Sequence, residues 1–180
     1  MIHYDLLYDG PRLQWPGQGI FRASSGVPTR QSSALQCDPE GGPIPEGSYF
    51  VLLGEEPKVP IPTPDCQIAP AWKVQRIPWG AEAGACAPYW ALWGQNRVRL
   101  TRVQSSPRRP CPTPRGGFYI HDSTKGYTHG CIEVEPRFFE VLRHVFGTMH
   151  SPHGRSRDRL YLLVKYLPGQ TTNGGTYGVR

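Results

Sequence analysis

Short runs in which apolar and polar residues alternate recur along most of the chain. This pattern is typical of β-strands with one buried face. Turn residues separate the runs, as in the Asp9-Gly10 signal that follows the first of them. The expected strands are 2–8, 12–15, 21–25, 48–53, 72–77, 89–94, 97–103, 118–121, 131–134 and 159–166. The pattern predicts a mainly β fold, either a β-sandwich or a partly open barrel.

One segment has the helical period instead. After Pro136, which suits the first position of a helix, apolar residues return every three or four positions. They are Phe138, Phe139, Leu142, Val145, Phe146 and Met149. We therefore expect one main α-helix at about 136–149.

The remaining segments are rich in turn residues. Residues 28–47, 56–70 and 104–115 contain many Pro and Gly residues, which indicates loops. We expect a single domain over 1–168. The polar, Gly-rich segment 169–180 is expected to be a flexible C-terminal tail.

Composition is consistent with a compact fold. The chain has 180 residues with 21 Gly and 20 Pro, yet 38% of its residues are hydrophobic and 11% are aromatic, too many for a disordered polymer. No apolar run approaches the roughly 20 residues of a membrane-spanning helix, so we expect no membrane span. The first residues, Met1 to Asp5, lack the basic start and apolar run of a secretory signal. We therefore expect the protein to be made in the cytoplasm without a signal peptide.

Charge is distributed unevenly along the chain. Residues 1–95 contain six basic and nine acidic residues, whereas 96–180 contain fourteen basic and five acidic residues. A basic half suits an anionic partner such as a cell-wall polymer, a nucleic acid or an acidic membrane surface, although a solvated arginine-rich surface has the same composition. Arg97, Arg99 and Arg102 alternate with apolar residues, as on the outer face of a strand. Because no aromatic residues are interleaved with them, we do not expect nucleic-acid binding.

The candidate chemistry lies between two expected strands. His121 ends one and Cys131 begins the next, so the side chains can meet if the strands pair. A thiol attacks as a thiolate, and a neighbouring imidazole can accept its proton. Gly130 lets the backbone approach a substrate closely, and the amides of residues 129–131 could face a developing oxyanion.

Other readings of these residues remain open. They can be a buried Cys and two histidines that serve only the fold. His121, His129 and Cys131 could also supply the three ligands that a metal site needs at minimum. We expect no metal and no dissociable cofactor, because a Cys–His pair is sufficient for acyl transfer.

Three motifs together resemble a known family. Thr128-His129-Gly130-Cys131 resembles the Ser/Thr-His-Gly-Cys signature of L,D-transpeptidases, the YkuD-like cysteine enzymes of peptidoglycan metabolism. The shorter His-to-Cys spacing is more similar to the compact L,D-transpeptidase effectors of type VI secretion systems. Residues 8–26 and the Gly-Pro-Ile-Pro-Glu-Gly-Ser-Tyr segment at 42–49 also resemble that family. The family's usual Asn or Arg after Gly-Cys-x is replaced by Glu133.

The resemblance implies an L,D-transpeptidase catalytic-domain fold and a mechanism. Cys131 would cleave the bond between meso-diaminopimelate and the terminal D-Ala of a tetrapeptide stem, with His121 as the proton carrier. Water would make the enzyme an L,D-carboxypeptidase, and a second amine would make it an L,D-transpeptidase that exchanges D-amino acids. The residues with expected roles are Gly130, His129 and Thr128 for the oxyanion or the substrate, Asp122 and Ser123 for orienting His121, and Tyr119, Glu46 and Tyr49 for substrate binding.

Cysteine count fits an exported toxin. Five cysteines leave one unpaired if four form disulfides, and Cys131 is the obvious free thiol. Cys37, Cys66, Cys86 and Cys111 allow three pairings, of which we favour Cys66–Cys86; all five thiols could equally stay reduced. Disulfides need an oxidising compartment. We expect an effector that acts in the target bacterium's periplasm, with a cognate immunity protein and a secretion-apparatus component or adaptor as partners.

Competing functions predict different behaviour. The alternatives are a housekeeping cell-wall L,D-transpeptidase, a different cysteine peptidase, a catalytically silent peptidoglycan-binding module and a nucleic-acid-binding protein. The common papain-like and cell-wall endopeptidase arrangements place Cys before His, whereas His121 precedes Cys131 here. A silent module would bind cell walls without a reactive thiol. A nucleic-acid-binding protein would show strongly salt-dependent binding and would not require Cys131.

Overall fold

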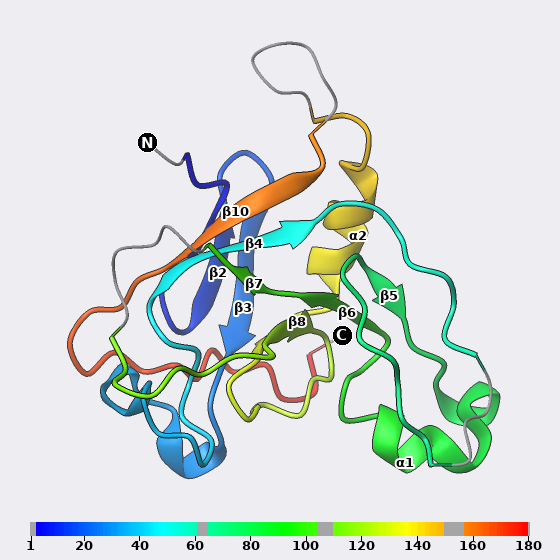
Figure 1. Ribbon diagram of the computed structural model, residues 1–180, viewed down its shortest axis with the longest axis horizontal. Helices are drawn as coiled ribbons and strands as arrows, with labels where there is room; N and C mark the ends of the chain where they lie inside the picture. The colour runs from blue at the N-terminus through cyan, green and yellow to red at the C-terminus, as the bar shows by residue number, and fades with distance from the viewer. Residues whose placement is uncertain (1–2, 61–64, 104–109, 150–156, 180) are drawn as a thin grey trace.

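The structure is a computed structural model that describes residues 3–60, 65–103, 110–149 and 157–179. Within these ranges, ten strands form one sheet in the order β5-β6-β8-β9-β3-β2-β1-β10-β4-β7 (Figure 1). The strands are β1 (Leu6–Tyr8), β2 (Arg12–Trp15), β3 (Gly19–Ser24), β4 (Gly47–Leu52), β5 (Gln75–Arg76), β6 (Asn96–Arg99), β7 (Thr101–Arg102), β8 (Tyr119–His121), β9 (Ile132–Val134) and β10 (Arg159–Val164). The expectation of a mainly β fold is confirmed.

The sheet curls into a half-barrel, because two strands that are adjacent in sequence pair at opposite ends of it. Strands β6 and β7 lie toward opposite ends of the strand order, yet only Leu100 separates them in sequence. Because β6 pairs with β8 and β7 pairs with β4, the two ends of the sheet must come close together. The single strand expected over 97–103 is therefore two short strands. The strand expected over 72–77 is only the two-residue β5.

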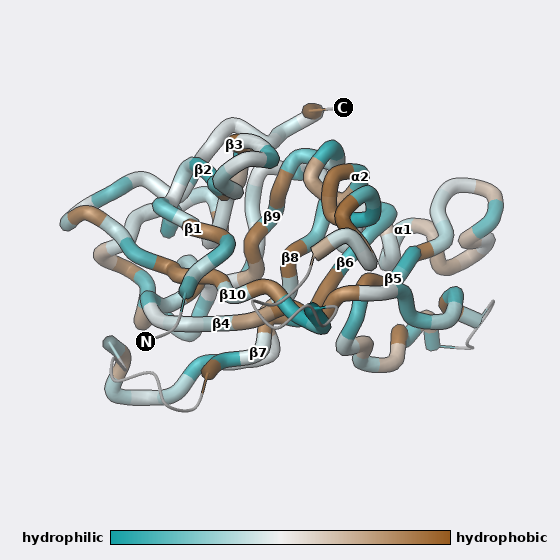
Figure 2. Tube along the Cα trace, turned by 90° about the horizontal axis from the view of Figure 1, so that it is seen from above, coloured by the Kyte–Doolittle hydropathy of each residue, from teal (hydrophilic) through white to brown (hydrophobic). Residues whose placement is uncertain are grey.

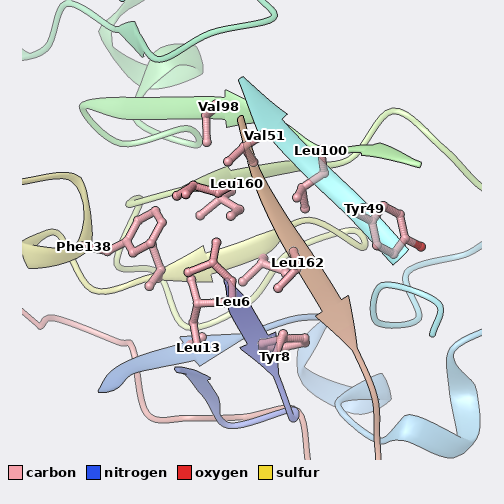
Figure 3. Close-up of a cluster of buried hydrophobic side chains, with 14 of the residues drawn as sticks. Leu6, Tyr8, Leu13, Tyr49, Val51, Val98, Leu100, Phe138, Leu160 and Leu162 are labelled. Atoms are coloured by element: carbon pink, nitrogen blue, oxygen red, sulfur yellow. The ribbon is translucent and has the colours of Figure 1, made fainter. Parts of the chain in front are cut away.

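The main hydrophobic core fills the curl of this sheet. Strand β10 pairs in parallel with β1 and antiparallel with β4, and its residues are buried alternately. Leu160 and Leu162 point from β10 toward Leu6 of β1 and Val51 of β4 (Figure 3). In Figure 2 the hydrophobic segments concentrate in β8, β9, β10 and α2, while most connecting loops are hydrophilic.

Helix α2 (Arg137–His144) is the longest α-helix among the described residues. Its apolar face is buried in the core, where Phe138 packs edge-on against Phe21 at 5.4 Å between ring centroids. The helix expected at 136–149 therefore forms, but it ends at His144 and residues 145–148 continue as turns. No helix in the described part of the chain is both long and apolar enough to cross a membrane.

A second, smaller hydrophobic cluster lies in the excursion between β4 and β6. It contains Val59, Ile77, Ala83, Cys86 and Trp90. Here a 3-10 helix, η3 (Gly80–Cys86), runs into helix α1 (Ala87–Trp90). The strand expected over 89–94 is wrong, because α1 extends to Trp90 and residues 91–93 form a turn. Short apolar runs fit either a strand or a helix. Two further 3-10 helices, η1 (Pro28–Arg30) and η2 (Ser33–Leu35), lie in the expected loop 28–47.

The C-terminal segment packs against the sheet instead of forming a flexible tail. Thr172 and Thr176 are fully buried. The hydroxyl of Thr172 donates to the Ser25 carbonyl at 2.6 Å, and the Gly178 amide donates to the Thr124 carbonyl at 2.8 Å. The described part of the chain therefore ends beside β8 (Figure 1), where it supports the loop that carries the candidate site.

Candidate active site

Strand pairing places the candidate residues on one face of the sheet. Arg97 pairs with His121 and Arg99 with Tyr119 across β6 and β8, while His121 lies in parallel register with Glu133 of β9. Side chains alternate between the two faces of a strand, so Val98, Ile120 and Ile132 enter the core on the other side. We call the face that carries Arg97, Tyr119, His121, Cys131 and Glu133 the polar face.

Cys131 lies one residue before β9, opposite Tyr119. The Tyr119 amide donates a hydrogen bond to Cys131 Sγ at 3.4 Å. Burial raises the pKa of the thiol, while this hydrogen bond and the charges of Lys125, Arg97 and Arg115 act to lower it. Burial is the largest of these effects, so Cys131 rests as a thiol at neutral pH.

His121 is almost fully buried at the end of β8. Burial, followed by the positive charges of Lys125 and Arg97, lowers its pKa to about 3. Its Nδ1 atom is buried and has no hydrogen-bond partner among the residues that the structure describes. Within the described residues no hydrogen bond joins His121 to Cys131, although they are diagonal neighbours on the polar face. The resting pair is therefore a neutral imidazole beside a neutral thiol.

Two residues beside Tyr119 and His121, Trp93 and Arg97, were not predicted from the sequence to belong to the site. Trp93 contacts the edges of both Tyr119 and His121, with ring centroids 5.2 and 5.6 Å apart. The Arg97 guanidinium lies 4.5 Å from the Trp93 ring centroid and 4.7 Å from that of Tyr119. The alternation of Arg97 with apolar residues indicated a strand face, but which face carried the site depended on its pairing with β8.

A network of hydrogen bonds fixes the loop between β8 and β9. Fully buried Glu133 accepts hydrogen bonds from the hydroxyl of Ser123, from that of Thr176 at 2.5 Å, and from the amides of Lys125 and Gly126 at 3.0 and 2.7 Å. Its position shows a structural role that the sequence did not indicate.

Asp122 and Ser123, which were expected to orient His121, form hydrogen bonds with other residues. The Asp122 carboxylate accepts hydrogen bonds from the amides of Gln95 and Asn96 at 2.7 and 2.9 Å and from Asn96 Nδ2 at 2.7 Å. Ser123 donates its hydroxyl hydrogen bond to Glu133. Among the described residues neither side chain forms a hydrogen bond with His121, so the structure does not support either residue as its orienter.

Thr128 and Gly130 shape the turn before Cys131. The Thr128 hydroxyl donates to the Cys131 carbonyl at 2.6 Å and accepts from the Gly130 amide at 3.1 Å. The Gly130 amide is therefore used inside the turn, and its expected oxyanion role is not supported. His129 is exposed at the tip of the turn. Gly130 has a φ of +115°, and a Cβ there would lie 2.7 Å from Arg115 Nη2 and 2.8 Å from Phe118.

The expected substrate-binding residues are mostly structural. Tyr49 is buried, and its hydroxyl donates to the Pro45 carbonyl at 2.8 Å. Burial raises the pKa of Tyr49 to about 12. Glu46 accepts a hydrogen bond from the Tyr166 amide at 2.9 Å. Tyr119 alone lies beside the thiol, where its backbone amide makes the contact.

Arg115 forms hydrogen bonds with the loops that surround the turn before Cys131. Its guanidinium donates to the carbonyls of Gln36 and Pro43 at 2.7 Å and of Gly42 at 3.0 Å. The turn at 42–47 therefore contacts Arg115 through its backbone carbonyls and not through its side chains.

The disulfides leave one free thiol. Cys66 pairs with Cys86, as favoured from the sequence, and Cys37 pairs with Cys111; their Cα atoms are 5.3 and 5.1 Å apart. Cys131 is the free cysteine. In the described residues no three His, Cys, Asp or Glu side chains come together as a metal site, so His121, His129 and Cys131 do not form the metal alternative.

Comparisons with known proteins do not assign this chain to a family. No protein-family model matches the sequence, and a search of curated proteins found no significant match. The geometry of the polar face is therefore the basis for any functional conclusion.

Proposed function

We propose that this protein is a cysteine L,D-carboxypeptidase or L,D-transpeptidase that acts on peptidoglycan stem peptides. The observation that carries the proposal is the position of the one free thiol on the same sheet face as a buried imidazole with an unpartnered Nδ1. The resemblance of residues 128–131 to the family signature supplies the substrate class.

The proposed reaction begins with proton transfer from Cys131 to His121. The sulfur attacks the carbonyl carbon that joins the L-centre of meso-diaminopimelate to the terminal D-Ala, and a C–S bond forms. When the C–N bond breaks, His121 returns the proton to the leaving amine. Water then hydrolyses the thioester and restores the thiol, or the amine of a D-amino acid or of another stem replaces the leaving group.

The electrostatics of the site are compatible with this order of events. A neutral His121 is able to accept a proton, whereas an imidazolium ion is not. The three cations around Cys131 favour a thiolate once the proton leaves. Because burial opposes the charged forms, we expect proton transfer to be coupled to substrate binding and not to occur in the resting enzyme.

The disulfides support a site of action outside the reducing cytosol. Cys37–Cys111 and Cys66–Cys86 would persist in an oxidising compartment such as the bacterial periplasm. We therefore propose an antibacterial effector that removes or replaces the terminal D-Ala in a target cell. A cognate immunity protein and a secretion-apparatus component or adaptor are its proposed partners.

The test is to incubate the purified protein with tetrapeptide muropeptides and to follow the products by mass spectrometry. The wild type should release D-Ala or exchange it for an added D-amino acid. Cys131→Ser and His121→Gln should each lower the rate by on the order of 10³-fold, because each removes a reacting group.

His144→Gln is the matched control, since His144 lies on the exposed side of α2. It should keep the wild-type rate and show that loss of a histidine is not enough to abolish turnover. Unchanged muropeptides with the wild type, or equal turnover by Cys131→Ser, would contradict the proposal.

A further inference from the structure

Within the described ranges, Arg97 is a buried cation without an anionic partner. Its residue exposure is only 3%. Nε donates to the Gln75 side-chain oxygen at 2.8 Å and Nη2 donates to the Ala69 carbonyl at 2.9 Å, so both acceptors are neutral. Nη1 has no partner in the described part of the chain. Burying a charge in this way costs stability, and such a charge is expected to serve a ligand.

Lys125 places a second cation at the same site. Its ammonium group donates to the Leu92 carbonyl at 3.0 Å. Its charge and that of Arg97 act on both His121 and Cys131. Among the described residues, no acidic side chain forms an ion pair with either cation.

The acid on the polar face offsets only part of this charge. Glu133 favours the charged form of Lys125, but its two oxygens already accept hydrogen bonds from two hydroxyls and two backbone amides. Arg115 adds to the positive field around Cys131, although its own hydrogen bonds go to backbone carbonyls. Three cations therefore act on the thiol, and the one carboxylate named on the polar face is not ion-paired with either Arg97 or Lys125 among the described residues.

We propose that Arg97 and Lys125 form a carboxylate-binding subsite beside Cys131, which selects acyl donors with a free carboxylate near the bond under attack. This inference rests on the proposed function for the identity of the donor. A tetrapeptide stem offers two such groups, the terminal carboxylate of D-Ala and the side-chain carboxylate of meso-diaminopimelate. Either group would pair with the cations.

Occupation of this subsite would also change the field at His121. An anion between Arg97 and Lys125 reduces the positive potential that disfavours an imidazolium ion. The same anion weakens the stabilisation that these cations give to a Cys131 thiolate. Recognition of the carboxylate is therefore linked to the charge states of both reacting groups, in opposite directions.

The first experiment does not depend on peptidoglycan chemistry. The rates at which iodoacetate and iodoacetamide alkylate Cys131 are compared with their rates on glutathione at low salt. The anionic reagent should be favoured at least about tenfold relative to glutathione, because the cations attract it to the thiol. Arg97→Gln and Lys125→Met should each remove most of this preference, and Arg97→Lys should keep part of it.

Arg76→Gln is the matched control, because Arg76 is an exposed residue on the neighbouring strand β5. It removes one positive charge and should leave the preference unchanged. A wild-type preference equal to that of glutathione, or one that persists in both Arg97→Gln and Lys125→Met, would overturn the subsite. Circular dichroism spectra identify any variant that fails to fold, and Arg97→Lys then serves as the comparison.

The second experiment identifies the carboxylate. Three synthetic tetrapeptides are compared: one with both carboxylates free, one with the D-Ala carboxamide and one with the diaminopimelate side-chain carboxamide. The amide that replaces the recognised carboxylate should lower kcat/KM by at least about tenfold, and Arg97→Gln should abolish this difference.

The two proposals fail in different ways. Equal cleavage of all three peptides by the wild type would overturn the subsite and leave the proposed function standing. Anion-selective alkylation without cleavage of any peptide would support the subsite and contradict the proposed function.

Discussion

At the scale of single residues, the site combines groups whose environments oppose their charged forms. Burial raises the pKa of Cys131 and lowers that of His121, so neither is ionised at rest. Positive charges from Arg97 and Lys125 act in opposite directions on the two groups, favouring the thiolate and disfavouring the imidazolium ion. A bound anion would favour the imidazolium ion and disfavour the thiolate.

The pKa of His121 makes a prediction about stability. Folding lowers this pKa from about 6.5 to about 3, so below pH 6.5 the unfolded chain binds a proton that the folded chain does not. The free energy of unfolding should therefore fall as the pH drops, by about 2 kcal/mol between pH 6.5 and 4.5 from this group. Urea denaturation at the two pH values should show a smaller fall for His121→Gln than for the wild type.

The comparison isolates His121 from its neighbours. The contributions of Asp122, Lys125, Arg97 and Cys131 are shared by the two proteins and largely cancel in the difference. His144→Gln should keep the wild-type pH dependence. An equal fall for the wild type and His121→Gln would show that His121 is not buried in its neutral form.

At the scale of elements, the site depends on two short parallel strands and the turn between them. Strands β8 and β9 are three residues each, and the loop between them is tied down by Glu133 and Thr128. Residue pattern predicted both strands and the turn at Gly130. It did not indicate the parallel pairing, because only the register places His121 beside Glu133 and Cys131 beside Tyr119.

Gly130 should be the least replaceable residue of this turn. Gly130→Ala would place a side chain at a φ of +115° and against both Arg115 and Phe118. Gly147→Ala is the matched control, since Gly147 has a φ of +77° with open space around it. Chemical denaturation should show that Gly130→Ala costs about 1–3 kcal/mol more than Gly147→Ala. Equal costs would mean that Arg115 and Phe118 move away freely.

At the scale of the whole molecule, the excursion between β4 and β6 and the C-terminal segment close the site from two sides. The excursion carries Trp93 against His121, and the C-terminal segment carries Thr176 to Glu133. Each disulfide joins loops that reach this region. Cys37–Cys111 closes the longer loop, with a sequence separation of 74 against 20 for Cys66–Cys86.

Removal of the disulfides should therefore have unequal effects. The chain-entropy relation gives about 4 kcal/mol for the longer loop and about 3 kcal/mol for the shorter one. Guanidinium denaturation of Cys37→Ser/Cys111→Ser and of Cys66→Ser/Cys86→Ser should show a larger loss for the first pair. The first variant should also alkylate at Cys131 with altered kinetics, because Gln36, which accepts a hydrogen bond from Arg115, directly precedes Cys37, and Arg115 acts on the Cys131 thiol. A wild type whose stability is unchanged by reduction would contradict the prediction.

The sequence by itself determined the mainly β architecture and the helix after Pro136, and it indicated Cys131 as the free thiol and His121 as its candidate partner. These follow from local periodicity and turn residues, which are properties of neighbouring residues, and from the number of cysteines in the chain. Only the tertiary structure decided that Asp122, Ser123 and Tyr49 are structural and that Arg97, Trp93 and Lys125 surround the site. Such roles depend on which strands pair and in which register, and contacts across many residues leave no periodic signal in a single sequence.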